Sequence, residues 1–236
     1  MEIQEKPTQD TPTESTNPPE IKKSALGLPG AIVIAGLIIG GAIFMNKTSG
    51  FSVDSEMNPL DLVAEVSSED VVRGDAKAEV TIIEYADFSC HFCAQYHPTL
   101  QRIVSESDGN VQWVYRHLPI FNKEAAMASS CVAKLGGNEA FWSYADMLYQ
   151  NTDKFSAVFY ENGAQDLGIE VSAYNACLSD ETLKSKIDRE FTQARLLLGF
   201  NATPYTVLID KDGRKFSFAG ALPYEDLMSA IEGLAK

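Results

Sequence analysis

The hydrophobic and polar positions give the first part of the chain two segments of opposite character. Residues 1–25 are rich in Pro, Thr, Glu and Asn and contain almost no large apolar side chain. Such a segment buries too little apolar surface to offset the entropy lost on folding, so we expect a disordered tail. Residues 26–45, LGLPGAIVIAGLIIGGAIFM, contain no charge. A helix of that length spans roughly the ~30 Å hydrocarbon core of a bilayer, which predicts a single transmembrane helix.

The flanks of this apolar run favour an uncleaved membrane anchor. A cleaved signal peptide is the alternative, but residues 1–25 are long and hold more acids than bases, unlike the short basic start of a signal peptide. Lys22 and Lys23 precede the run, and only Lys47 lies close after it. This bias predicts a cytoplasmic N-terminus and a C-terminal domain outside the cytoplasm, in the periplasm or at the cell exterior. The polar residues 46–67 predict a linker to that domain.

After the linker, the pattern is that of one folded domain, residues 68–236. Glu79–Tyr85 is dense in β-branched and aromatic residues, which is typical of a buried strand. A helix-like segment follows from about His91 to Val104, interrupted by Pro98, and a second strand begins at Val111. The first half of the domain therefore predicts a strand, a helix and a strand.

Residues from about 123 to 199 show a helical period instead. In the last of these helices, Asp180 can cap the start and Gly199 can end it in a left-handed conformation. Apolar side chains recur every three or four positions along that helix, at Leu183, Ile187, Phe191, Ala194 and Leu198.

Strand signals return at 205–210, and the dipeptide Asp212-Gly213 predicts a tight turn into a second strand of a hairpin. Residues 224–234 then predict a closing helix. The order of elements indicates an α/β sheet that is interrupted by a helical insertion at about 123–199.

The chain holds 33 acidic and 19 basic residues, and nearly all of its formal charge of −14 falls after residue 49. So acidic a domain is repelled by phosphate backbones, which excludes nucleic acid as a partner. The acidity itself identifies no substrate.

Two of the four cysteines, Cys90 and Cys93, lie close together where a predicted strand ends and a helix begins. The unpaired N–H groups and the dipole at a helix start favour a thiolate at Cys90, which is the nucleophile of thiol exchange. Cys93 follows about one turn later and can attack a mixed disulfide on Cys90. We therefore expect Cys90 to be the nucleophile and Cys93 the resolving thiol.

Other interpretations of this C-x-x-C motif are half of a zinc site and a purely structural disulfide. His91, His97 and His117 supply no second cluster with metal-ligand spacing, so we expect no metal. The corner between a strand and a helix favours the redox motif over a structural disulfide. We also expect that the protein uses no cofactor.

The stretch Val80–Pro98, VTIIEYADFSCHFCAQYHP, resembles the active-site region of DsbA-type thiol-disulfide oxidoreductases of the thioredoxin superfamily. Glu84 lies six residues before Cys90, where that family has a buried acid, and Pro98 lies where thioredoxin-like helices kink. Thr203-Pro204 opens a strand and matches the family's cis-proline loop. The resemblance covers roughly residues 70–236, and it implies a thioredoxin-like sheet with a helical insertion.

The resemblance implies that Glu84 relays the proton of Cys93 and that Thr203 and Pro204 bind the backbone of the substrate. Desolvation of a lone acid in an apolar strand suits the relay, while an edge position facing water is the alternative for Glu84. A proline at the beginning of a strand indicates a turn, and a cis bond is what the family has there.

The dipeptide between the cysteines departs from the better-known forms of the family. His91 stands where proline is common, and Phe92 stands where the most oxidising members have histidine. A cationic His91 can stabilise the Cys90 thiolate, but Phe92 offers neither a charge nor a conventional donor. The redox strength of the pair therefore stays open.

Cys131 and Cys177 lie on helical patterns within the insertion. In an oxidising compartment, a bridge between them would constrain the unfolded chain by about 4 kcal/mol. The alternative is two inert buried thiols, because free cysteines favour protein cores. DsbA-like proteins with cysteines at similar places imply a structural bridge.

These observations predict an oxidase that donates the Cys90–Cys93 disulfide to reduced exported proteins. The resemblance implies reoxidation by a DsbB-like or quinone-linked membrane partner. A disulfide reductase or isomerase is the alternative enzyme, although no separate dimerisation domain is evident. A redox-inactive peptide-binding or chaperone module that uses the groove beside Pro204 is a third possibility.

Overall fold

The computed structural model describes residues 58–199 and 202–234 of the chain. The predicted tail (1–25), the apolar run (26–45) and most of the linker lie outside the described residues. Within the described ranges, no helix is both long and apolar enough to cross a membrane. The transmembrane anchor at residues 26–45 therefore stays a prediction.

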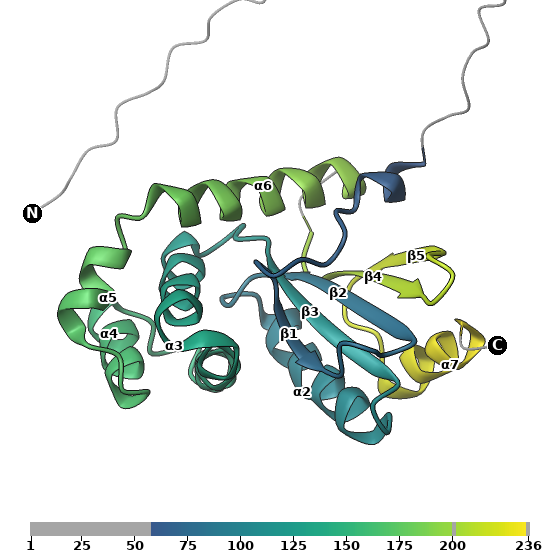
Figure 1. Cartoon of the computed structure of the whole chain (residues 1–236), viewed down its shortest axis with the longest axis horizontal. Helices are drawn as coiled ribbons and strands as arrows, with labels where there is room; N and C mark the ends of the chain where they lie inside the picture. Colours follow the sequence, from purple (N-terminus) through teal and green to yellow (C-terminus); the bar gives the residue numbers. More distant parts are fainter. Residues whose placement is uncertain (1–57, 200–201, 235–236) are drawn as a thin grey trace, which may run out of the picture. The chain divides into compact units, whose positions relative to one another are not determined.

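One mixed sheet of five strands forms the centre of the domain, in the order β1-β3-β2-β4-β5 (Figure 1). The central strand β2 (Val80–Ala86) is parallel to β3 (Val111–His117) and antiparallel to β4 (Tyr205–Asp210). The edge strands β1 (Val71–Gly74) and β5 (Lys215–Ala219) pair antiparallel with β3 and β4. The thioredoxin-like sheet expected from the sequence is thus confirmed, with β1 added to it.

Helices cover both faces of this sheet (Figure 1). Helix α2 (His91–Glu106) packs on one face next to α7 (Tyr224–Leu234), and α6 (Glu181–Leu198) crosses the other face. The short 3₁₀ helix η1 (Pro59–Leu62) contacts α6. Pro98 lies inside α2, which continues past it to Glu106.

The expected helical insertion lies between β3 and β4, and α6 is its last helix. It begins with α3 (Lys123–Gln150), in which Gly137 adopts a non-helical conformation and marks a kink. The shorter helices α4 (Ala157–Asp166) and α5 (Val171–Cys177) pack against α3. As predicted, Asp180 caps α6 by accepting the N–H of Thr182 at 2.8 Å, and Gly199 ends it with a φ of 68°.

The side chains of β2 alternate between two hydrophobic cores because successive residues of a strand point to opposite faces. Ile82 and Ala86 belong to the core beneath α2, which extends past Trp113 of β3 to Phe141, Trp142 and Tyr144 of α3. Ile83 and Tyr85 belong to the smaller core beneath α6. Glu84 has the parity of Ile82, so its carboxyl points toward α2.

Arg116 ties the segment before β1 to the sheet. Its guanidinium donates to both carboxylate oxygens of Asp70 and to the carbonyls of Ala64 and Glu65. Arg116 is 3% exposed, so this ion pair is buried and fully hydrogen-bonded. Arg116 and its neighbour His117 are the last two residues of β3.

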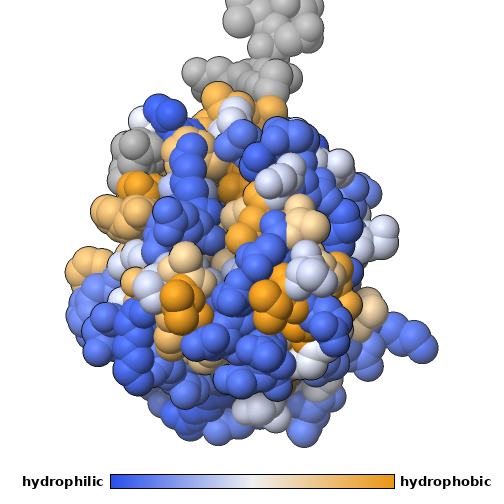
Figure 2. All heavy atoms as spheres, turned by 90° about the vertical axis from the view of Figure 1, so that its left-hand side faces the viewer, coloured by the Kyte–Doolittle hydropathy of each residue, from blue (hydrophilic) through white to orange (hydrophobic). Residues whose placement is uncertain are grey.

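The side of the domain formed by the insertion is predominantly hydrophilic, with apolar side chains gathered only in small separate patches (Figure 2). This distribution agrees with the excess of acidic residues after residue 49. No single broad apolar face is present in that view.

Candidate functional site

Cys90 and Cys93 lie at the first turn of α2, directly after the carboxyl end of the central strand. Cys90 occupies the N-cap position, with extended backbone angles, and the N–H of Ala94 donates to its carbonyl at 3.0 Å. Both cysteines are free thiols, 5% and 0% exposed. The site therefore presents one sulfur near the surface and a second sulfur beneath it.

The segment before β4 faces these two sulfurs. The thiol of Cys90 donates to the carbonyl of Thr203 at 3.3 Å, and the hydroxyl of Thr203 lies 3.1 Å from the sulfur of Cys93. The Thr203-Pro204 peptide bond is cis. A backbone carbonyl next to a reactive sulfur can orient an extended peptide, so this loop is placed where a bound chain would meet Cys90.

Glu84 lies under the dithiol on β2 and is 0% exposed. Its Oε2 accepts the indole N–H of Trp113 at 3.2 Å, and Oε1 has no hydrogen-bond partner among the described residues. Burial raises the pKa of Glu84 to about 8, although the bond from Trp113 opposes the shift. The side chain is therefore mainly a neutral acid at pH 7, which can hold or give a proton.

The pKa values of the two thiols are shifted in opposite directions. The Cys93 side chain, followed by the backbone N–H groups of Cys93 and Phe92, lowers the pKa of Cys90 to about 7, while burial and the charge of Asp87 act against it. Burial raises the pKa of Cys93 far above its usual value, and Cys90 and Glu84 add to that effect. Cys90 is consequently the group that ionises near neutral pH, and Cys93 stays protonated.

The two residues between the cysteines are exposed on the surface. The rings of His91 and Phe92 meet edge to face with centroids 5.8 Å apart, and Phe92 is 60% exposed. Phe121, in the loop between β3 and α3, is 67% exposed. The surface beside the two cysteines thus presents the exposed aromatic ring of Phe92 next to that of His91.

The remaining two cysteines form a disulfide. The bond between Cys131 and Cys177 joins α3 to α5 inside the insertion. Neither sulfur is part of the Cys90 site. Within residues 58–199 and 202–234, no group of three or more His, Cys, Asp or Glu side chains could hold a metal ion.

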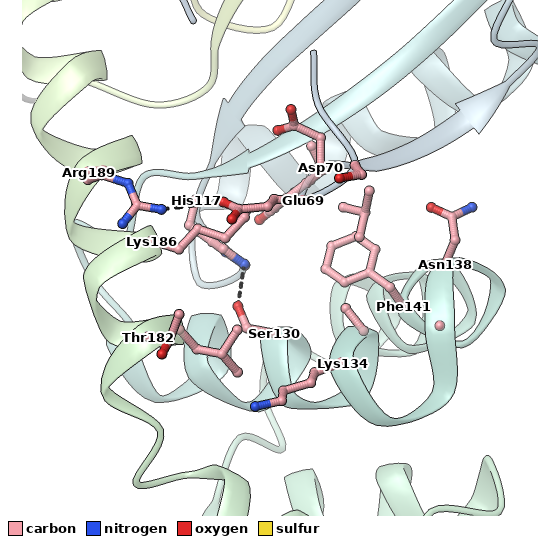
Figure 3. A pocket seen from close by; sticks show the side chains of 16 residues that line it. Glu69, Asp70, His117, Ser130, Lys134, Asn138, Phe141, Thr182, Lys186 and Arg189 are labelled. Carbon is pink, nitrogen blue, oxygen red and sulfur yellow. Dashed lines mark hydrogen bonds and ion pairs between the residues drawn. The ribbon is translucent and has the colours of Figure 1, made fainter. Parts of the chain in front are cut away.

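A cavity of about 380 Å³ lies away from the dithiol, between α3, α6 and the segment before β1 (Figure 3). His117 and Ser130 lie at its buried end and are joined by a 3.0 Å hydrogen bond. Lys186 and Arg189, on its α6 side, are each paired with a carboxylate, of Glu190 and Glu69 respectively. The cavity therefore offers few groups that lack a partner, and neither cysteine of the dithiol lines it.

The structure brings Cys90, Cys93 and Glu84 together with Thr203 and Pro204, although the sequence separates β2 from β4 by the whole insertion. Sequence reasoning missed Asp87, which lies between the end of β2 and the start of α2. The signal was present, because an aspartate two residues before a turn residue commonly accepts the N–H at that position.

Thiol chemistry on a thioredoxin-like sheet with a helical insertion is the combination found in DsbA-like proteins, and the fold and dithiol place this chain in that class. A family model described as Thioredoxin matches residues 66–233. Because this match covers most of the chain, the protein belongs to that thioredoxin family.

Solved structures agree with this assignment. DsbA2 of Pseudomonas aeruginosa is 31% identical, with a TM-score of 0.61 over 73% of this chain and 97% of that chain. A periplasmic thioredoxin-like protein from Salmonella enterica serovar Typhimurium is 20% identical, has a TM-score of 0.62 over 77% and 99% of the two chains, and shows the fold alone.

Among curated proteins, the Na(+)/H(+) antiporter NhaA 3 of Salinispora tropica is 30% identical over 143 residues, which cover 58% of this chain and 21% of the antiporter. The chain thus spans about a fifth of the length of the first curated relatives that it matches. The transport activity of those relatives says nothing about this domain.

Proposed function

We propose that the protein is a thiol-disulfide oxidoreductase that donates a Cys90–Cys93 disulfide to reduced exported proteins. The observation that carries the proposal is the opposite acidity of the two sulfurs, with Cys90 at the helix start facing Thr203 and Cys93 buried behind it. An exchange catalyst needs one thiol that is a good nucleophile and leaving group and a second that resolves the mixed disulfide.

In the oxidising direction, a client thiolate attacks the sulfur of Cys90. A client–Cys90 disulfide forms, the Cys90–Cys93 bond breaks, and the leaving sulfur of Cys93 takes a proton. The neutral carboxyl of Glu84 is the donor for that proton because its pKa of about 8 keeps it protonated at pH 7. A second client thiolate then attacks the client sulfur, a client disulfide forms, and Cys90 leaves as a thiolate. Two electrons pass from the client to the dithiol.

The oxidised enzyme is regenerated when a membrane partner, DsbB-like or linked to quinone, accepts those two electrons. Residues 26–45 anchor the chain with its N-terminus in the cytoplasm and hold the domain beside such a partner. The Cys131–Cys177 disulfide supports an extracytoplasmic location, because structural disulfides persist in oxidising compartments. The periplasmic Salmonella protein of the same fold supports it as well.

The competing function is a disulfide reductase or isomerase, and one observation favours it. Phe92, between the two cysteines, offers neither a charge nor a conventional donor to a Cys90 thiolate, and a less stabilised thiolate makes the disulfide a weaker oxidant. A redox-inactive peptide-binding module is a third function, and for it the substitution Cys90→Ser would leave activity intact.

A redox titration against glutathione, combined with thiol trapping in the native cell envelope, separates these functions. The oxidase predicts a potential above that of thioredoxin, which is about −270 mV, and Cys90 found oxidised in the cell. A potential near thioredoxin's with Cys90 found reduced would establish the reductase or isomerase instead. A Cys93→Ser variant should accumulate mixed disulfides with exported proteins, and a Cys90→Ser variant, its matched control, should not. Absence of trapped clients would contradict both enzymes.

A further inference from the structure

Asp87 is a buried acid beside the dithiol that the exchange chemistry leaves unused. It lies between β2 and α2 and is 1% exposed. Its Oδ1 accepts the N–H of Ser89 at 2.7 Å, and its Oδ2 accepts the N–H groups of Phe121 at 2.6 Å and Asn122 at 3.1 Å. One carboxylate therefore satisfies three backbone donors from two different loops.

The first of these loops leads directly into the reactive cysteine. The carbonyl of Asp87 accepts the N–H of Cys90 at 3.0 Å, while its carboxylate accepts the N–H of Ser89. An aspartate that bonds the backbone two residues ahead fixes a turn without help from regular structure. The position of Cys90 at the helix start thus depends on the side chain of Asp87.

The second loop connects the site to the helical insertion. Asn122 caps α3 by accepting the N–H of Ala125 at 2.8 Å, and its amide group donates to the hydroxyls of Ser89 and Tyr160, each at 2.9 Å. Because Tyr160 belongs to α4, the loop that bonds to Asp87 is held by two helices of the insertion. The exposed ring of Phe121 is carried on this same loop.

Asp87 also brings a charge close to the reactive sulfur. The ionisable groups near Cys90 are Cys93 and His91 on α2, Glu84 on β2 and Asp87 in the turn; the facing residues of the cis-proline loop are uncharged. Glu84 is mainly neutral at pH 7, so Asp87 is the carboxylate that acts on a Cys90 thiolate, although burial also raises the pKa of Asp87 while its backbone hydrogen bonds oppose that shift. Two nearby negative charges repel each other, which disfavours the thiolate.

We propose that Asp87 is a positioning residue that locks the reactive cysteine to the insertion and keeps a negative charge beside its sulfur. The hydrogen bonds of Asp87 hold Cys90 and the loop that carries Phe121 in one rigid frame. The charge weakens the thiolate as a leaving group and so makes the disulfide a milder oxidant. The inference concerns the dithiol of the proposed function and deepens that proposal.

The test is Asp87→Asn in the full chain, which removes the charge while keeping the size of the side chain and one acceptor oxygen. The pKa of Cys90, followed by thiolate absorbance at 240 nm, should fall by about 0.5 pH unit or more. The equilibrium with glutathione should shift about threefold or more toward the reduced protein, since each pH unit of thiol acidity is a factor of ten. A residue with only a structural role would move neither quantity in this direction.

Two control variants separate the effect of the Asp87 charge from the effect of the hydrogen bonds that join the two loops. Asp212→Asn removes an exposed charge in the β4–β5 turn and should change nothing. Asn122→Ala breaks the link to Ser89 and Tyr160 but keeps the charge of Asp87. It should leave the pKa of Cys90 within about 0.2 pH unit of the wild type and slow exchange with peptide thiols. If Asp87→Asn does not fold, Asp87→Ser retains an acceptor for the turn and is titrated in its place.

An unchanged or raised Cys90 pKa in folded Asp87→Asn would overturn the inference. The absorbance titration needs no client, so the result is independent of turnover. A wild-type protein without exchange activity whose Asp87→Asn variant still shows the lower pKa would refute the proposed function and leave the role of Asp87 standing.

Discussion

The burial of Glu84 predicts that this residue destabilises the reduced protein in a pH-dependent way. Its pKa is about 8 in the folded chain and 4.5 without the fold. Below pH 4.5 both states bind the proton and there is no cost. As the pH rises through 4.5, the unfolded chain releases the proton and the folded chain keeps it, so stability falls until the pH passes 8.

The magnitude follows from the two pKa values. One pH unit corresponds to about 1.36 kcal/mol, so the cost is roughly 0.4 kcal/mol at pH 4.5, about 3 kcal/mol at pH 7 and nearly 5 kcal/mol above pH 8. Replacing the carboxyl with a carboxamide of the same size removes the titration and keeps an acceptor for Trp113. Glu84→Gln should therefore be more stable than the wild type by these amounts.

The assay is urea unfolding of wild type and Glu84→Gln at pH 4.5, 7 and 8, with both active-site thiols kept reduced by a phosphine. The matched control is Glu79→Gln, which removes an exposed acid just before β2 and should give the same difference in stability at each pH. If the stability gained by Glu84→Gln is constant from pH 4.5 to 8, the carboxyl does not titrate as a buried group and the proton-relay argument fails.

Two further predictions concern the scaffold. Replacing both Cys131 and Cys177 with serine should lower the free energy of unfolding by about 4 kcal/mol, the loop-entropy value for a sequence separation of 46. The pKa of Cys90 should stay unchanged. A loss of stability below about 1 kcal/mol in urea unfolding would contradict the role of the disulfide as a constraint on the unfolded chain. Gly74→Ala should cost at least about 1 kcal/mol, because Gly74 has a φ of 110° and an added Cβ would lie 2.6 Å from the carbonyl oxygen of Val111. Gly213→Ala, at a φ of 79° with open space around it, is the control, and an equal loss in thermal unfolding would show that the close approach in β1 is unimportant.

The elements with strong local signals were predictable from the sequence. Dense β-branched residues identified β2, and an aspartate and a glycine placed the two ends of α6. Strand β1 was missed because its four residues, Val71–Gly74, lie at the sheet edge and have only intermediate burial or exposure. A strand that short has no periodicity to detect, and its position depends on pairing with β3.

The residues of the candidate site also differ in how far the sequence predicts them. Cys90 and Cys93 are recognised as a motif because their spacing carries the chemistry. The role of Asp87 could not be predicted, because it depends on two N–H groups from a loop that is more than thirty positions away in sequence. The acidity of Glu84 likewise depends on burial beneath α2, which a strand pattern cannot distinguish from an edge position.

The pairing of β2 with β4 has a consequence for biogenesis. Tyr85 pairs with Tyr205, so the strand that carries Thr203 and Pro204 enters the sheet only after the whole insertion has been made. A chain that leaves the ribosome or the translocation channel from its N-terminus exposes Cys90 and Cys93 first, then Cys131, and Cys177 last. Once the membrane partner has oxidised Cys90 and Cys93, the thiolate of Cys131 can attack their disulfide until residue 177 emerges. The order of synthesis therefore makes this chain its own first potential client.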